Sequence, residues 1–209
     1  MIELQNISKS FEDNIVIDQF SYTFQKGQSY AIIGMSGSGK TTLLNIIGKL
    51  EKPTNGEVIV DGVSLKKIKE KDYFKNCVGY LFQNYGLIEN ESIENNLNLS
   101  IVDHTLNKNQ RAEKMKSALL KVNLNLDLKR KVFSLSGGEA QRVAIAKLIL
   151  KDPPIILADE PTASLDEHNS SEIIKLLFEL MTEERIIIVS THSPTVYNKV
   201  AHIIQLEKL

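Results

Sequence analysis

The stretch Gly34-Met35-Ser36-Gly37-Ser38-Gly39-Lys40-Thr41 decides the fold of this sequence. It fits the pattern G-x-x-x-x-G-K-[ST] and stands between an apolar segment typical of a strand, residues 30–33, and a segment typical of a helix, which begins near Lys40. Glycines let backbone N–H groups turn toward an anion, and the positive end of the following helix attracts the same anion. This context favours a phosphate-binding loop over a glycine-rich turn with a surface lysine.

The polar side chains of this loop have separate expected roles toward Mg²⁺-ATP. Lys40 is expected to reach the β- and γ-phosphates, and the Thr41 hydroxyl is expected to ligate Mg²⁺. Thr42 is expected to touch the α-phosphate. The predicted nucleotide contacts in the loop are Gly34, Ser36, Gly37, Ser38, Gly39, Lys40, Thr41 and Thr42.

A second element, Ile-Ile-Leu-Ala-Asp-Glu at residues 155–160, is an apolar strand that ends in two carboxylates. Ligands of open α/β folds bind at the carboxyl ends of the strands. Asp159 is therefore expected to hold Mg²⁺, directly or through water, and Glu160 is expected to orient and polarise the attacking water. Two solvated acids at a strand end are the alternative, which the phosphate loop disfavours.

Strand and helix patterns alternate along most of the chain. Strands are predicted at residues 2–4, 14–17, 30–33, 57–60, 78–82, 155–158 and 186–189, and helices at 40–48, 66–75, 107–122 and around 173–181. Residues 84–150 consist mostly of polar helix formers and are predicted to be a helical insertion. Apolar strands that alternate with helices indicate an α/β fold, in which a mainly parallel sheet is covered by helices on both faces.

Composition limits the classes of function. The chain has 209 residues, 42% of them hydrophobic, and we expect one domain. Lysine and arginine number 25 against 26 acidic residues, so no basic field attracts nucleic acid, and no nucleic-acid partner is expected. The single cysteine, Cys77, lies in an apolar run and suits a reducing cytosol as a buried packing residue. No segment is apolar enough to insert into a membrane, and no secretory signal is expected.

The segment Leu135-Ser136-Gly137-Gly138-Glu139, followed by Ala-Gln-Arg, closely resembles the signature of ATP-binding-cassette (ABC) ATPases. By its residues alone it is a helix N-terminus capped by Ser136, with two glycines that allow close backbone approach. An ordinary helix cap is the alternative. The segment also precedes the acidic strand by the interval that this family shows.

Other positions resemble the same family in the same order. Gln83 resembles the Q-loop glutamine, which senses Mg²⁺ and the attacking water, and Asp166 lies in a segment similar to the D-loop. His192 resembles the switch histidine that contacts the γ-phosphate. Phe11 falls where the family stacks an aromatic ring on adenine, and Val16 is placed among the nucleotide contacts. The sequence departs from the family at three positions. Phe11 replaces the commoner tyrosine, Ala163 replaces glycine, and Lys147 replaces arginine. These departures put nucleotide affinity in doubt.

The resemblance covers essentially the whole chain and implies a phosphate-loop NTPase fold of the ABC type. It implies a core with an N-terminal antiparallel β subdomain over residues 1–83 and 151–209, and a helical subdomain over residues 84–150. It also implies a head-to-tail homodimer in which Ser136, Gly137 and Gly138 of one copy complete the ATP site of the other. Hydrolysis would then separate the copies.

Residues 83–97 resemble a branch of the family that comprises macrolide exporters, lipoprotein-releasing systems and bacitracin-resistance pumps, and within it lactococcin-type bacteriocin exporters. This implies an ATPase that powers export through a separate membrane permease and lies on the inner face of the cell membrane. Tyr85, Leu87 and Ile88 are candidates for the permease surface, or they pack inside the helical part. The alternatives are a soluble cassette protein that acts on DNA or ribosomes, which usually has two cassettes or a coiled coil, and a phosphate-loop kinase or GTPase, which has no use for residues 135–139.

Overall fold

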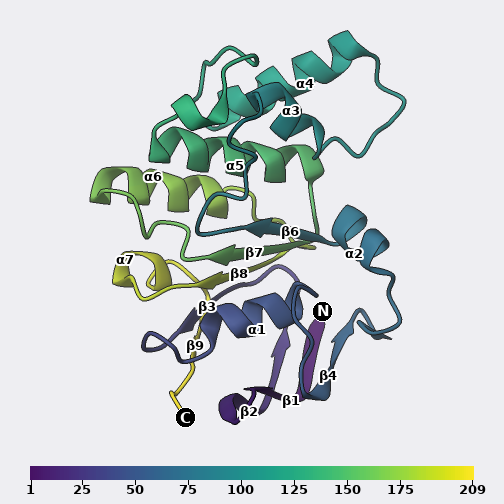
Figure 1. The fold of residues 1–209 in the computed structure, drawn as a ribbon, viewed down its shortest axis with the longest axis vertical. Coiled ribbons are helices and arrows are strands. Elements are labelled where there is room, and N and C mark those ends of the chain that lie inside the picture. The colour runs from purple at the N-terminus through teal and green to yellow at the C-terminus, as the bar shows by residue number, and fades with distance from the viewer. The chain divides into compact units, whose positions relative to one another are not determined.

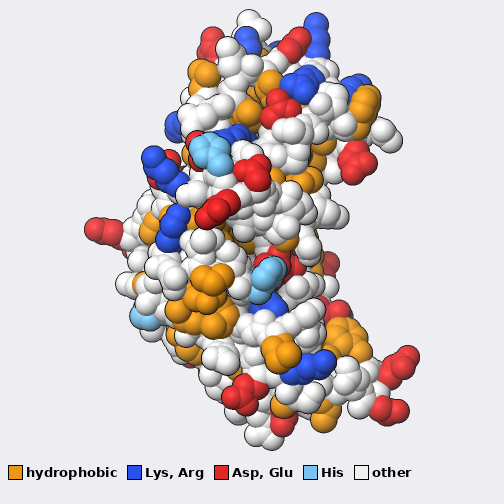
Figure 2. Space-filling model, turned by 90° about the vertical axis from the view of Figure 1, so that its left-hand side faces the viewer, with side chains coloured by type: hydrophobic (Ala, Val, Ile, Leu, Met, Phe, Trp, Pro, Cys, Tyr) orange, Lys and Arg blue, Asp and Glu red, His pale blue; other side chains and the backbone are white.

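The computed structural model describes every residue from Met1 to Leu209. The chain forms two compact units (Figure 1). The first consists of Met1–Tyr80, Pro154–Glu160 and Met181–Leu209, and the second of Leu81–Pro153 and Pro161–Leu180. Acidic and basic side chains are interspersed over the face drawn in Figure 2, in keeping with a net charge of -1.

The first unit contains a five-stranded sheet in the order β6-β7-β8-β3-β9. Its strands are β3 (Ser29–Ile33), β6 (Val78–Leu81), β7 (Ile155–Asp159), β8 (Ile186–Ser190) and β9 (His202–Gln205). β3 pairs in parallel with β8 and β9, and β7 pairs in parallel with β8. Every residue of β7 and β8 is buried, which explains why both strands read as continuous apolar runs.

An antiparallel sheet of order β2-β1-β4-β5 completes the β structure of this unit. Its strands are β1 (Ile2–Phe11), β2 (Asn14–Phe24), β4 (Asn55–Val60) and β5 (Val63–Ser64). β1 and β2 are longer than the alternation of apolar residues predicts. The register between them shifts three times, and Asn6 has a positive φ, so bulges interrupt the period of two on which the prediction depended.

Three helices belong to the first unit: α1 (Lys40–Ile47), α2 (Glu70–Asn76) and α7 (Pro194–Tyr197). α1 buries Leu43, Leu44, Ile46 and Ile47 and ends at Gly48, as predicted. The predicted helix over residues 66–75 begins only at Glu70, because the carbonyls of Leu65 and Ile68 accept hydrogen bonds from the Lys49 ammonium instead of continuing a helix. Cys77 packs against the core but is only partly buried.

The second unit is helical and contains α3 (Ile93–Asn98), α4 (Lys108–Lys121), a short 3₁₀ turn (Val132–Ser134), α5 (Gly137–Lys151) and α6 (Glu167–Phe178). Asn107 caps α4 in a capping box with Gln110, at the start predicted from the sequence. The predicted helical subdomain over residues 84–150 lies within this unit. The unit also contains residues 161–180, which the resemblance places in the core, because α6 packs on α5.

None of the helices combines the length and the apolar character that crossing a membrane requires.

Candidate functional site

The loop between β3 and α1 has the backbone of an anion cradle. Gly34, Gly37 and Gly39 all have positive φ, and Gly39 is the left-handed N-cap residue of α1. A Cβ on Gly34 would lie 2.5 Å from the Leu206 carbonyl oxygen and from Ser38 Oγ, so only glycine fits. The glycines are therefore required by the path of the loop, which brings it to the N-terminus of a helix.

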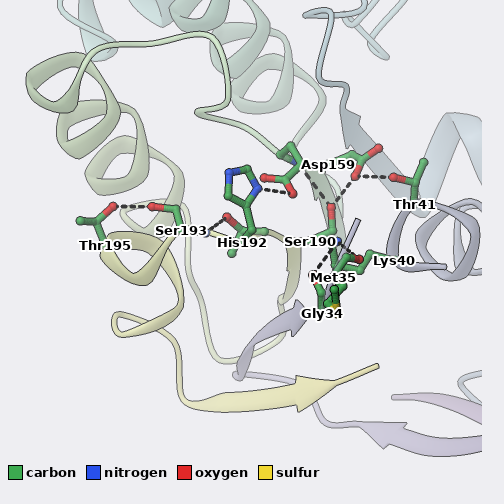
Figure 3. Close-up of polar contacts among 11 residues, drawn as sticks. Gly34, Met35, Lys40, Thr41, Asp159, Ser190, His192, Ser193 and Thr195 are labelled. Atoms are coloured by element: carbon green, nitrogen blue, oxygen red, sulfur yellow. Dashed lines mark hydrogen bonds and ion pairs between the residues drawn. The ribbon is translucent and has the colours of Figure 1, made fainter. Parts of the chain in front are cut away.

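Two side chains of the loop are arranged for a ligand. Ser38 is 2% exposed, and its Oγ is buried without a hydrogen-bond partner. The Lys40 ammonium donates to the carbonyls of Gly34 and Met35 at 2.9 and 3.1 Å, so it lies across the loop (Figure 3). An unsatisfied buried hydroxyl and a cation held only by backbone carbonyls both suit the binding of an anion here.

Asp159, at the end of β7, receives two hydroxyl donors. Thr41 Oγ1, in the first turn of α1, donates to Asp159 Oδ1 at 3.0 Å, and Ser190 Oγ, at the end of β8, donates to the same oxygen (Figure 3). Asp159 and Ser190 are also register partners in the parallel pair. The parallel sheet thus brings a carboxylate and two hydroxyls together at its carboxyl edge, next to the glycine loop that follows β3.

Glu160 and His192 form a second polar pair at this edge. His192 Nδ1–H donates to Glu160 Oε1 over 2.9 Å, and the Glu160 backbone N–H donates to the Ser190 carbonyl at 3.0 Å. The Glu160 side chain is 15% exposed, whereas that of His192 is 71% exposed. Glu160 also has a left-handed φ of 44°, which is rare for a residue with a side chain and is found where function constrains the backbone.

Tyr80, on β6, lies near Asp159 and contacts helix α1. Its hydroxyl donates to Asn45 Oδ1 on α1 at 2.8 Å. Burial, together with the nearby Asp159 carboxylate, raises the pKa of Tyr80 well above its ordinary value, so the phenol stays protonated. Tyr80 therefore ties β6 to α1 as a hydrogen-bond donor.

Phe11 and Val16 lie on the hairpin of β1 and β2. Phe11 is 46% exposed. The Lys9 ammonium lies over one face of the Phe11 ring, 4.6 Å from the ring centre. Lys9 is itself held by Glu51 at 2.8 Å. Val16 packs against the last glycine of the phosphate loop, since a Cβ on Gly39 would lie 3.0 Å from Val16 Cγ1.

This contact makes Gly39→Ala a test of the loop geometry. The new methyl group meets both a φ of +90° and the wall formed by Val16, whereas Gly62→Ala meets a φ of +80° with open space around it. We expect Gly39→Ala to lower the free energy of unfolding by about 1–3 kcal/mol more than Gly62→Ala does. Urea unfolding of both variants measures the difference, and equal losses would contradict the packing of Val16 on the loop.

In the second unit, the predicted signature segment is a helix N-terminus, as its residues indicate. Ser136 Oγ accepts the Glu139 N–H at 3.2 Å, and Glu139 Oε2 accepts the Ser136 N–H at 2.8 Å, which together form a capping box. Arg130 holds the Glu139 carboxylate with its guanidinium. The exposed Ser136 thus stands at the positive end of the 15-residue helix α5.

The segment around Asp166, at the start of α6, packs against the N-terminus of α5. Asp166 caps α6 by accepting the backbone N–H and the side-chain amide of Asn169, and these hydrogen bonds lower the pKa of its carboxyl group. Asn169 Oδ1 would lie 3.2 Å from a Cβ on Gly138, so the glycine allows the two helix starts to approach. Gly137, Gly138 and Asp166 are therefore brought together within this unit.

The loop after β6 carries Gln83 and the three residues expected either to meet a permease or to pack inside. Gln83 and Ile88 are exposed, Ile88 by 52%, while Tyr85 and Leu87 are half-buried. Tyr85 packs on α5, because its Oη would lie 2.9 Å from a Cβ on Gly137. Of the three, Ile88 is the one that presents apolar surface to solvent.

Ser190 is a site residue that the sequence did not single out. Its hydroxyl contacts both carboxylate residues, as a donor to Asp159 and as an acceptor, at 3.3 Å, of the Glu160 N–H. Its position at the end of a buried strand, two residues before His192, is the signal that could have identified it. The close partners Thr41 and Asp159 are 118 residues apart in the chain and were both predicted, although their direct contact was not.

Comparison with known proteins identifies the family that has this arrangement of residues. The family model described as "ABC transporter" matches residues 17–163, which include the glycine loop, the signature segment and the acidic strand. The chain belongs to the ABC transporter family. It is the nucleotide-binding, ATP-hydrolysing cassette of that family.

Curated relatives match along nearly the whole chain. The uncharacterized ABC transporter ATP-binding protein YvrO of Bacillus subtilis is 38% identical, over 95% of this chain and 90% of the relative. The macrolide export ATP-binding/permease protein MacB of Campylobacter jejuni is 34% identical over 99% of this chain, but this cassette spans only 33% of that protein. The part of MacB that lies beyond the match has no counterpart in these 209 residues.

A solved structure extends the likeness to three dimensions. The cassette MJ0796, in a dimeric post-hydrolysis state bound to ADP and Pi, superimposes with a TM-score of 0.90 at 32% identity. The match covers 100% of this chain and 96% of that one. The predicted fold, an ABC-type α/β NTPase with an antiparallel β part and helices, is therefore confirmed, and so is the predicted ATPase activity.

Proposed function

We propose that this ABC ATPase powers export of a peptide, bacteriocin, antibiotic or lipid-like substrate through a separate membrane permease. The observation that carries the proposal is one cluster at the edge of the parallel sheet, where the glycine loop, Thr41, Asp159 and the Glu160–His192 pair meet. The export direction is supported by the resemblance of residues 83–97 to exporters and by the likeness to a macrolide export protein.

Residues of the first unit would bind ATP and position water. Backbone N–H groups of the loop and the ammonium of Lys40 would surround the β- and γ-phosphates, with Ser36, Ser38 and Thr42 adding side-chain contacts. Phe11 would stack on adenine by the ring face that Lys9 leaves open. Glu160 would take the proton of the attacking water, and His192 would hold that carboxylate and contact the γ-phosphate, giving ADP and phosphate.

The donor set also fits Mg²⁺. Thr41 and Asp159 present a hydroxyl and a carboxylate oxygen 3.0 Å apart, and Mg²⁺ is usually bound by one or two such protein oxygens with phosphate and water. When bound, the ion would neutralise charge that develops on the phosphates. Gln83 would complete the set, and Ser190 would orient Asp159 through its hydrogen bond.

A second copy of the chain would complete each site. Ser136, Gly137, Gly138 and Asp166 lie at two adjacent helix N-termini of the second unit, and a helix N-terminus attracts anions. The γ-phosphate of ATP bound by one copy would meet this segment of the other. The dimeric state of the MJ0796 cassette supports this arrangement.

The permease would hold the ATPase at the inner face of the cell membrane. Ile88 is a candidate contact because its exposed apolar side chain lies in the segment, residues 83–97, that resembles the exporter branch.

Capture of the partner tests the transport function. We expect the tagged chain, recovered from detergent-solubilised membranes of its own host, to bring down a protein with several membrane spans, identified by mass spectrometry. Ile88→Asp should reduce this recovery by about tenfold, because a buried unpaired charge opposes an apolar interface, whereas the exposed Leu120→Asp serves as control. Recovery with ribosomal proteins or DNA in place of a membrane protein would overturn the proposal in favour of a soluble ABC ATPase.

A further inference from the structure

The loop that follows β6 has an unusual backbone. Tyr85 and Gly86 both have left-handed φ values, 68° and 61°, and the Tyr85 N–H donates to the Phe82 carbonyl at 2.9 Å. Gly86 accommodates the turn, because a Cβ there would lie 2.6 Å from the Phe82 ring. Tyr85 has a side chain, and a left-handed conformation is unfavourable for such a residue unless the surroundings hold it.

A lysine of α5 makes the first contact that holds this turn. The Lys147 ammonium donates to the Gly86 carbonyl at 2.8 Å across 61 residues of sequence. Lys147 is largely removed from solvent, and this burial, aided by the charge of Lys151, lowers its pKa. Its ammonium has no carboxylate partner, so the hydrogen bond to Gly86 is what compensates for its lost hydration.

Tyr85 makes the second contact, near the other end of the same helix. Its Oη would lie 2.9 Å from a Cβ on Gly137, the first residue of α5, so the phenol rests directly on the helix backbone. The two contacts lie ten residues apart on α5, at Gly137 and Lys147. A short loop held at two separated points of a 15-residue helix cannot pivot freely on that helix.

We propose that Lys147 and Tyr85 are positioning residues that clamp the Gln83 loop to helix α5 and so fix how Gln83 is presented. The consequence is that loss of either contact loosens the loop and lowers the fraction of time that Gln83 spends in a productive position. The inference rests on the proposed role of Gln83, while the clamp itself rests on the two contacts.

The test compares Lys147→Met, Lys147→Arg and Tyr85→Phe in the full chain. Because methionine fills the space without donating a hydrogen bond, we expect amide hydrogen exchange over residues 83–88 to speed up by about tenfold in the nucleotide-free protein. We also expect kcat for ATP to fall by about tenfold while KM changes by less than about twofold, because the loss concerns placement and not binding. Tyr85→Phe, which removes only the oxygen facing Gly137, should raise exchange over the same residues.

The conservative variant and a control separate the clamp from a general loss of stability. Lys147→Arg should restore both slow exchange and kcat, because a guanidinium N–H can donate to the same carbonyl. Lys116→Met, at an exposed lysine of α4, should leave both unchanged. Unchanged exchange in Lys147→Met, faster exchange with unaltered turnover, or failure of Lys147→Arg to rescue would each overturn the inference. A wild-type chain that does not hydrolyse ATP would count against the proposed function instead, and the exchange comparison would still decide whether the clamp exists.

Discussion

Lys40→Ala is expected to lower the rate of ATP hydrolysis by at least about a thousandfold, because it removes the one side-chain cation of the phosphate loop. In the structure the ammonium donates to the carbonyls of Gly34 and Met35, within the glycine loop. A triphosphate bound by the loop would offer this ammonium charged acceptors in place of two neutral ones, and charged acceptors form stronger hydrogen bonds. Release of inorganic phosphate at saturating Mg²⁺-ATP measures the loss.

Two further variants make this test specific. Lys40→Arg keeps the charge but replaces a compact ammonium with a larger planar group in a tight loop, so we expect turnover to remain at least about tenfold below the wild type. Lys52→Ala removes an exposed lysine outside the loop and should leave turnover unchanged. Wild-type turnover in Lys40→Ala would refute the assignment of the loop as the site of hydrolysis.

The parts of the site that were predictable from the sequence are those whose functional residues lie close together along the chain. The glycine loop, the Asp159–Glu160 strand end and the Ser136 cap each lie within eight or fewer neighbouring residues, and local rules of strands, turns and caps apply to them directly. The parallel sheet then explains how β3 and β7 deliver the glycine loop and the acidic strand end to one edge, whereas the Ser136 cap belongs to the second unit.

The parts that were not predictable depend on contacts between distant segments. The hydrogen bond from Ser190 to Asp159 spans 31 residues, and that from Lys147 to Gly86 spans 61, so neither leaves a local pattern. β9 was missed for a different reason. It is an edge strand whose residues are mostly exposed, and it lacks the continuous apolar run that marks the buried strands of the same sheet.

Glu160→Gln should turn the protein into a stable ATP-bound dimer, because it removes the carboxylate that accepts a proton from water while leaving the phosphate loop intact. Glutamine preserves the size of the side chain that lies 2.9 Å from His192, so the site keeps its shape. With Mg²⁺-ATP, light scattering should show the mass double from the 23.5 kDa of one chain, and hydrolysis should fall by about a thousandfold. Glu113→Gln, at an exposed carboxylate of α4, should do neither.

A second substitution in this background shows which surface the dimer uses. Ser136→Asp and Ser136→Asn both retain an oxygen that can cap α5, so the helix start should survive in each. They differ by one negative charge, and a carboxylate aimed at the partner's triphosphate would repel it. We therefore expect Glu160→Gln with Ser136→Asp to remain a monomer that still binds ATP, and the Asn version to dimerise. Dimers of equal stability in both would show that the helix tip of one copy does not face the nucleotide of the other.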